Sequence, residues 1–359
     1  MSGKVLIGLA SGALFLALAF WGVPLDKLGA AVAALELPWL LPIAGLYMLQ
    51  QILRAWRQQM LVHAVKPGST WWSHFGILCM SFFCINTLPA RIGEVVRPWL
   101  LNELEDVPFG AGFGVVFAER AIDLIFVLAT LSAILLLADV PMGPVVIGEM
   151  SWDVVELGRG AALGVLPPVL AVVVGLVFFG EPVMRLLRWC AATAERLLPF
   201  AVVRRVMALL LSFSQSFSEG LVAFRSPALM AKVGPLTLLI WGMTGWIYVM
   251  LAHALGFGEL IGWLESMGVL VITMLGSTVP APPGMAGVYE AFVRAGLAVF
   301  GVRGEGLDGP ALAFALVAHW WLYGVQASSA FYFFWARGVS LGRVWGVARR
   351  GLDRLRGAG

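Results

Sequence analysis

The stretch NTLPARIGEVVR, residues 86–97, decides the fold, because it places a proline, a glycine and three charges directly after an apolar run. Proline ends or kinks a helix, since it lacks a backbone N–H and clashes with the preceding turn. A second stretch, STVPAPPGMAGVYE at residues 277–290, also follows an apolar run and contains the same Thr-x-Pro-Ala sequence. The sequence therefore predicts two helical hairpins, each of which is broken at its tip.

The 359-residue chain around these stretches is strongly apolar: 60% of the residues are hydrophobic, 13% are charged, and the mean hydropathy is +0.90. Soluble domains carry about 25% charged residues. The apolar runs are about 17–27 residues long, enough for a helix to cross a hydrocarbon core ~30 Å thick. This pattern excludes a soluble enzyme and predicts an all-α polytopic membrane protein. The runs lie at residues 5–23, 39–61, 72–88, 112–138, 161–180, 234–255, 263–279, 286–302 and 311–336.

Loop charges predict the orientation, because cytoplasmic loops carry an excess of Lys and Arg. Residues 181–232 hold seven cations and three anions, and are expected to form a cytoplasmic amphipathic stretch. Residues 139–160 hold one cation and four anions, and are expected outside. The tail, residues 337–359, has six Arg and one Asp, which is typical of a segment near anionic lipid. Both termini are therefore expected in the cytoplasm, in a bacterial-type inner membrane.

The same rule leads to the first hairpin. Arg54, Arg57 and Lys66 place the end of the second run inside, and the run at 112–138 must also start inside to reach the acidic loop. An even number of crossings therefore lies between these points, although the charged segment there is too short for an ordinary span. A re-entrant hairpin at residues 72–101, which dips in from the cytoplasm, satisfies both conditions.

A second re-entrant hairpin is expected at residues 263–302, where Pro and Gly interrupt the apolar sequence, and it would enter from the outside. The sequence thus predicts a single flippase-like domain, residues 1–336, with about six full spans plus two opposed re-entrant helical hairpins. Eight or nine full spans are the alternative. Opposed hairpins with similar breaks are typical of an inverted-topology repeat, so an internal repeat is a further hypothesis.

Ionisable residues lie in or beside these apolar segments, four positive and four negative. A lone charge at the centre of a bilayer costs about 2.5–3.5 kcal/mol on insertion scales, so these charges are expected to be paired or to face water. Residues three or four apart on a helix are neighbours, so Glu94 is expected beside Arg97, and Glu290 beside Arg294. One interpretation is that all eight form structural ion pairs between helices. They are Arg91, Glu94, Arg97, Glu119, Arg120, Asp123, Glu290 and Arg294.

The other interpretation is a binding site for a lipid headgroup. Charges that follow a Pro or Gly break lie near free backbone amides, which favour anions, and a guanidinium group holds a phosphate with paired donors. Arg91 and Arg97, beside the Pro89 break, are therefore the expected phosphate contacts. The expected substrate-binding residues are Arg91, Glu94, Arg97, Asn86, Glu290 and Arg294. The residues expected to brace a cavity are Glu119, Arg120 and Asp123. Those expected to shape the breaks in the hairpins are Pro89, Gly93, Pro280, Pro283, Gly284 and Gly287.

Three motifs resemble those of the lysylphosphatidylglycerol synthase transmembrane family, which includes the flippase part of the multiple peptide resistance factor. The motifs are Asn86-x-x-Pro89-x-Arg91-x-Gly93-Glu94-x-x-Arg97, Glu119-Arg120-x-x-Asp123 and Pro280-x-x-Pro283-Gly284-x-x-Gly287-x-x-Glu290. The resemblance runs over about residues 5–336, and it implies translocation of a lipid between leaflets through a cavity between two hairpins. No counterpart of the factor's synthase domain is present in this sequence, so neither synthase activity nor the lysyl lipid is carried over.

Two other function classes stay open: an intramembrane enzyme acting on a lipid-linked sugar or phosphate, and a non-transporting membrane partner protein. No catalytic motif is found, so an enzyme is not expected, and without a Gly-x4-Gly-Lys-Ser/Thr loop ATP is not expected to drive the chain directly. The three Cys and four His form no metal-ligand pattern, and His319 is expected in the core or in a cavity. No cofactor, metal or nucleic acid is expected. The expected partners are membrane lipids (a phospholipid, or a hopanoid or polyprenyl lipid) and other copies in a homo-oligomer.

Overall fold

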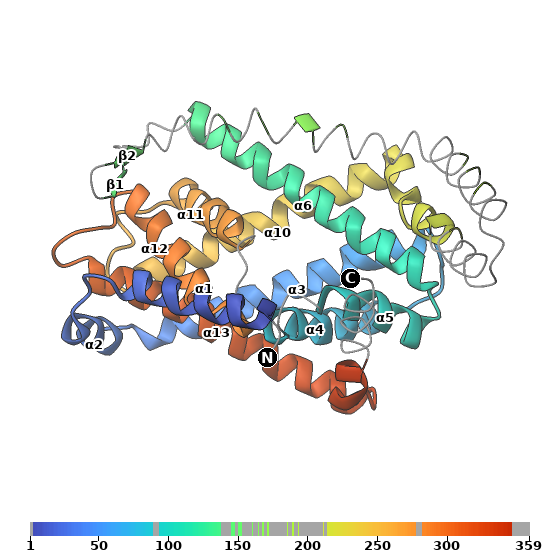
Figure 1. The fold of residues 1–359 in the computed structure, drawn as a ribbon, viewed down its shortest axis with the longest axis horizontal. Coiled ribbons are helices and arrows are strands. Elements are labelled where there is room, and N and C mark those ends of the chain that lie inside the picture. Colours follow the sequence, from blue (N-terminus) through green and yellow to red (C-terminus); the bar gives the residue numbers. More distant parts are fainter. Residues whose placement is uncertain are drawn as a thin grey trace.

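The computed structural model describes residues 3–88, 93–137, 145–147, 150–152, 214–277 and 282–346, together with isolated positions between 160 and 211. The described helices pack into an elongated bundle (Figure 1). Those of the first half are α1 (Gly3–Phe20), α2 (Leu25–Ala33), α3 (Leu40–His63), α4 (Trp71–Thr87), α5 (Gly93–Glu105) and α6 (Phe109–Leu137). Those of the second half are α10 (Pro227–Ala254), α11 (Trp263–Gly276), α12 (Val288–Val299) and α13 (Asp308–Ala336). Short 3-10 turns lie at η1 (Leu37–Trp39), η3 (Val222–Arg225) and η4 (Pro283–Met285), and β1 (Val145–Ile147) pairs antiparallel with β2 (Met150–Trp152).

Local sequence sets where several of these helices begin. The Thr70 hydroxyl oxygen accepts the Ser73 backbone N–H at 3.3 Å and caps α4. The Ser226 hydroxyl likewise caps α10, and Pro227 occupies the first helical position, where a missing N–H costs nothing. Helix α10 therefore begins inside the stretch 181–232, which the sequence predicts as one cytoplasmic amphipathic segment.

The two halves of the bundle repeat one order of elements: a long helix, a hairpin broken at its tip, and a second long helix. In the first half these are α3, the α4–α5 hairpin and α6; in the second they are α10, the α11–α12 hairpin and α13. The packing also repeats, because α4 lies on α13 while α11 lies on α6, and α3 lies along α10. Each hairpin thus packs against the last helix of the other half, as in a repeat related by a two-fold axis.

The halves run in opposite directions (Figure 1). The backbone N–H of Glu36, just before α3, donates to the carbonyl of Ala254 at the end of α10. Near the other end of the pair, Arg57 of α3 donates to Thr237 of α10. Helices α3 and α10 are therefore antiparallel, which is the arrangement that an inverted repeat produces.

The hairpin tips meet near the middle of the bundle. Turn η4 packs against α4, and a Cβ placed on Gly284 would lie 3.8 Å from the carbonyl oxygen of Asn86. Gly284 and Gly287 have φ angles of 75° and 84°, a region that favours glycine, so these residues allow the chain to turn between α11 and α12. In the first hairpin, a Cβ on Gly93 would lie 2.3 Å from the backbone of Ile85, so only glycine permits α4 and α5 to approach so closely.

Among the residues that the structure describes, α10 is long and apolar enough to cross a membrane by itself, and α1 with α2, bent by 79°, makes a second candidate. The predicted number of about six full spans therefore stays a prediction. Large apolar side chains are nevertheless exposed on several long helices, and exposed apolar surface of this kind marks a membrane or protein interface. They include Leu41, Leu49 and Trp56 on α3, Leu238, Leu239 and Trp246 on α10, and Phe331, Tyr332 and Trp335 on α13.

Candidate functional site

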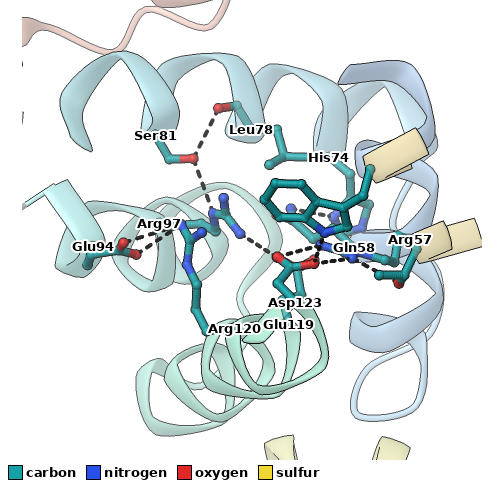
Figure 2. Close-up of polar contacts among 12 residues, drawn as sticks. Arg57, Gln58, His74, Leu78, Ser81, Glu94, Arg97, Glu119, Arg120 and Asp123 are labelled. Carbon is teal, nitrogen blue, oxygen red and sulfur yellow. Dashed lines mark hydrogen bonds and ion pairs between the residues drawn. The ribbon is translucent and has the colours of Figure 1, made fainter. Parts of the chain in front are cut away.

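Charged side chains from several helices converge inside the first half of the bundle (Figure 2). Arg57 of α3 donates two hydrogen bonds to the carboxylate of Asp123 on α6, at 2.6 and 3.1 Å. The same guanidinium donates to Thr237 Oγ1 at 3.0 Å, and Trp241 Nε1 donates to Asp123 at 3.0 Å. Arg57 is only 2% exposed and Asp123 7%. The paired donors and acceptors compensate two charges that would otherwise be buried alone.

A second buried ion pair joins Arg97 of α5 to Glu119 of α6 (Figure 2). Arg97 Nε also donates to Ser81 Oγ on α4 at 3.3 Å, so this side chain ties three helices together. Arg97 is 1% exposed, yet its Nη2 has no hydrogen-bond partner among the described residues, and neither has Glu119 Oε1. The third pair, Arg120 with Glu94 at 3.2 Å, lies nearer the surface of the cluster.

These partners differ from those that helical spacing predicts. Glu94 of α5 pairs with Arg120 of α6, and Arg97 pairs with Glu119 of α6 instead of with Glu94. An ion pair within one helix contributes only about 0.2–0.5 kcal/mol, because both side chains stay at the helix surface. Buried charges need a partner on the facing helix, and α6 presents one to each charge on α5. For these residues the geometry is that of structural ion pairs between helices.

Two arginines of α3 belong to this cluster, although the sequence indicates only that they mark the cytoplasmic end of an apolar run. Arg57 binds Asp123, and the guanidinium of Arg54 lies 5.2 Å from the centroid of the Trp241 ring. The signal in the sequence is a polar residue at every third or fourth position of an apolar run, which places Gln50, Arg54 and Arg57 on one helix face. Gln50 also finds a polar partner on this face, since it donates to the Ile240 carbonyl of α10 at 2.7 Å.

A smaller polar group lies in the second half, around Glu290 of α12. One carboxylate oxygen accepts the Gly287 backbone N–H at 2.8 Å and caps the helix, while the other lies 2.8 Å from Nδ1 of His319 on α13. The His319 ring stacks on Tyr289, whose hydroxyl hydrogen-bonds that of Tyr248 at 2.8 Å. His319 is thus the partner of Glu290, and its side chain is 11% exposed.

Arg294 is placed differently from the expectation that it pairs with Glu290. Its Nη1 donates to the backbone carbonyls of Ala19 and Trp21, at 2.8 and 2.9 Å, and its Nη2 lies 3.5 Å from Asp308. A cation at the carboxyl end of a helix satisfies free carbonyl groups there. Arg294 therefore fixes the end of α1 against α12.

The remaining predicted residues divide into two groups. Asn86 lies one residue from the end of α4, facing the second hairpin tip through its carbonyl group, and Pro283 begins the turn between α11 and α12. Pro89, Arg91 and Pro280 lie outside the described residues. In the part of the chain that the structure describes, no group of three or more His, Cys, Asp or Glu side chains could hold a metal ion.

Comparison with known proteins identifies the family. A family model described as the lysylphosphatidylglycerol synthase TM region matches residues 5–328, which include both hairpins and both polar groups. No curated protein and no solved structure matches the chain. Because the match covers most of the chain, this helical membrane protein belongs to the family of lysylphosphatidylglycerol synthase TM regions.

Proposed function

We propose that this protein moves a polar-headgroup lipid between the two leaflets of the membrane. The headgroup passes between the hairpin tips, while the acyl chains stay in the surrounding lipid. The observation that carries this proposal is the meeting of two oppositely directed, broken hairpins, with Asn86 of one facing Gly284 of the other, beside a buried group of charged side chains. The family assignment supports a membrane function connected with lipids.

Helix lengths support hairpins that enter the membrane and return. Helix α4 has 17 residues and α11 has 14, so at 1.5 Å per residue they are about 25 and 21 Å long. A hydrocarbon core is ~30 Å thick, whereas α3, with 24 residues, extends over about 36 Å. Each hairpin would then reach the interior and turn there, with its tip near the midplane.

Broken backbone inside a membrane needs polar partners. Non-helical segments are tolerated at that depth only where protein buries them or where they line a water-filled cavity. The Asn86 carbonyl group lies beside the turn at Gly284, so backbone polar groups of both hairpins would be available along one path. Arg91, which lies in the first tip by sequence, remains the proposed headgroup contact, whereas the guanidinium of Arg97 is already engaged by Glu119.

The proposed location is a bacterial-type inner membrane, with the basic tail in the cytoplasm. In this orientation the α4–α5 hairpin enters from the cytoplasm and the α11–α12 hairpin from the outside. Translocation would be downhill, or coupled to an ion gradient, since the sequence has no phosphate-binding loop for ATP.

The test is leaflet exchange of fluorescent phospholipids in liposomes that contain the purified protein. A membrane-impermeant reductant bleaches the outer leaflet, and the bleached fraction reports how many lipids have crossed. We expect exchange above that of empty liposomes, with a large loss in Arg91→Ala and in Glu94→Gln. Arg343→Ala is the matched control, because Arg343 pairs with Glu103 at an exposed site.

The outcomes separate the alternatives. No exchange of anionic, zwitterionic or aminoacylated lipids, with or without an imposed proton gradient, would contradict phospholipid translocation. Full exchange in a well-folded Arg91→Ala variant would leave translocation standing and refute the headgroup contact at the first tip.

A further inference from the structure

The charged cluster of the first half contains one cation more than it has carboxylates. Among the described residues of the cluster, four arginines face three carboxylates. Arg57, Arg97 and Arg120 each have a carboxylate within 4.0 Å. Arg54 has no such partner in the part of the chain that the structure describes. The members are Arg54, Arg57, Arg97 and Arg120, with Glu94, Glu119 and Asp123.

Three of these guanidinium groups surround one aromatic ring, that of Phe82 on α4. The guanidinium carbons of Arg97, Arg54 and Arg120 lie 4.7, 5.5 and 5.9 Å from the centroid of this ring. They come from three different helices, α5, α3 and α6. The face of an aromatic ring attracts a cation, but it supplies no acceptor for the hydrogen-bond donors of a guanidinium group. Three cations that share one ring also repel one another.

The arginines around Phe82 keep donors without acceptors. Buried nitrogen atoms of all three, Arg54 Nε, Arg97 Nη2 and Arg120 Nε, have no hydrogen-bond partner among the described residues. Buried polar groups in folded proteins nearly always have one. Arg97 is 1% exposed and thus built into the interior, whereas Arg54 and Arg120 are only partly buried.

We infer that Arg54, the arginine beside Phe82 that has no carboxylate partner among the described residues, binds the phosphate group of an anionic ligand. A guanidinium group holds two phosphate oxygens with parallel donors, and its plane stays stacked on an aromatic ring while it does so. Arg54 has both features available, because its guanidinium carbon lies 5.5 Å from the Phe82 ring and 5.2 Å from the Trp241 ring and it has no carboxylate to displace among the described residues. A phosphodiester carries one negative charge, which would balance the single unpaired cation of the described cluster.

The position of Arg54 within α3 favours a lipid as the source of this phosphate. Arg54 lies nine residues before His63, the last residue of α3, which is about 14 Å along the helix. A headgroup reaches such a depth only if the lipid has moved away from the bilayer surface and into the protein. This choice of source rests on the proposed translocation. The binding of a phosphate by itself does not, because inorganic phosphate shares the same chemistry.

The experiment measures equilibrium binding, not transport. The full-length protein in a neutral detergent is titrated with radiolabelled phosphatidylglycerol, and inorganic phosphate and glycerol 3-phosphate are then added as competitors. Diacylglycerol, which has the same chains and no phosphate, serves as the ligand control. The variants are Arg54→Gln, Arg54→Lys and Lys66→Gln. Lys66→Gln is the matched control, because Lys66 lies just after α3, is about as large as Arg54 and carries the same charge. Its side chain, however, is 43% exposed and pairs with Asp106.

We expect Arg54→Gln to weaken phosphatidylglycerol binding by about tenfold or more, because a charge-assisted pair of donors is lost. Arg54→Lys keeps the charge without the planar donors, so it should bind severalfold more weakly than the wild type. Lys66→Gln should bind within about twofold of the wild type, since exposed charges contribute little. The ligand-free Arg54→Gln protein should unfold no more easily than the wild type, because no carboxylate loses its partner.

Each outcome decides the inference. Equal affinity of wild type and Arg54→Gln, or binding of diacylglycerol as tight as that of phosphatidylglycerol, would overturn it, as would a wild type that binds neither lipid nor phosphate. If Arg54→Gln fails to fold, Arg54→Lys decides in its place. Competition by inorganic phosphate would identify the site as one for any phosphate, and its absence would identify a lipid headgroup. Phosphate binding without leaflet exchange would retain this site and refute only the proposed translocation.

Discussion

Removing one partner of the buried Arg57–Asp123 pair should destabilise the protein strongly. In Arg57→Gln, Asp123 loses two hydrogen bonds, of 2.6 and 3.1 Å, and among the described residues keeps only the one from Trp241. Breaking a buried pair from one side costs about 3–5 kcal/mol, because it leaves an uncompensated charge in the interior. The exposed pair of Arg343 and Glu103, at 3.3 Å, is a matched control, and Arg343→Gln should cost about 0–1 kcal/mol.

The assay is reversible unfolding in mixed micelles, followed by circular dichroism as the fraction of denaturing detergent rises. Arg57→Gln, Asp123→Asn and the double variant make a thermodynamic cycle, and the control is Arg343→Gln. We expect the double variant to lose much less free energy of unfolding than the two single variants together, since it removes both charges and leaves no buried one alone.

Equal costs for Arg57→Gln and Arg343→Gln would refute this reasoning. That result would mean that water reaches Arg57 and Asp123 and screens them as it screens surface charges. The 2% exposure of Arg57 would then describe only one of the conformations that the protein adopts.

Further predictions concern the hairpin tips and use the same unfolding assay unless stated. Gly287→Ala should lower the free energy of unfolding by more than about 1–2 kcal/mol, the usual penalty of a left-handed conformation, because the new Cβ would also meet the backbone of α1 at 2.5 Å. The control is Gly29→Ala, which has open space around it and should not destabilise the protein. Glu290→Ala should cost about 1–3 kcal/mol, since it leaves the Gly287 N–H without its cap and His319 without its carboxylate partner, and an unchanged stability would contradict this assignment. Cysteines at Asn86 and Gly284, in a background without the native cysteines, should be joined by a short bifunctional maleimide, whereas cysteines at Asn86 and Gly29 should not. Failure of the first pair to cross-link would contradict the contact between the tips.

The helices could be predicted from the sequence because their signals are local. Apolar runs at 39–61 and 263–279 correspond to α3 (Leu40–His63) and α11 (Trp263–Gly276). Proline and glycine likewise placed the breaks, because their effect on the backbone depends on few neighbours. The two broken hairpins also followed from sequence, the first through the balance of loop charges and the second through its Pro and Gly residues, whereas their entry into a membrane from opposite sides stays a prediction.

The partners of the buried charges could not be predicted in this way. Spacing along one helix shows which residues share a face, but it does not show which helix that face meets. Glu94 and Arg97 are neighbours on α5, yet each pairs with α6, because that helix supplies the opposite charges. The place of Arg54 in the cluster could not be predicted for the same reason: a charge near the end of an apolar run is typical of a cytoplasmic boundary, and the aromatic rings beside it belong to α4 and α10.

The two halves share their architecture but not their chemistry, and this difference limits what the scaffold can do. Among the described residues, four arginines lie around the hairpin of the first half, whereas the second half has the Glu290–His319 contact at the corresponding junction of hairpin and last helix. In the proposed orientation the positive excess lies on the cytoplasmic side, so a phosphate-bearing headgroup should be captured faster and held longer there. A binding site cannot shift the equilibrium between leaflets, since it changes the rates of the forward and reverse passage together. The asymmetry therefore sets which leaflet supplies the headgroup first, and net transport in one direction requires a gradient to which the passage is coupled.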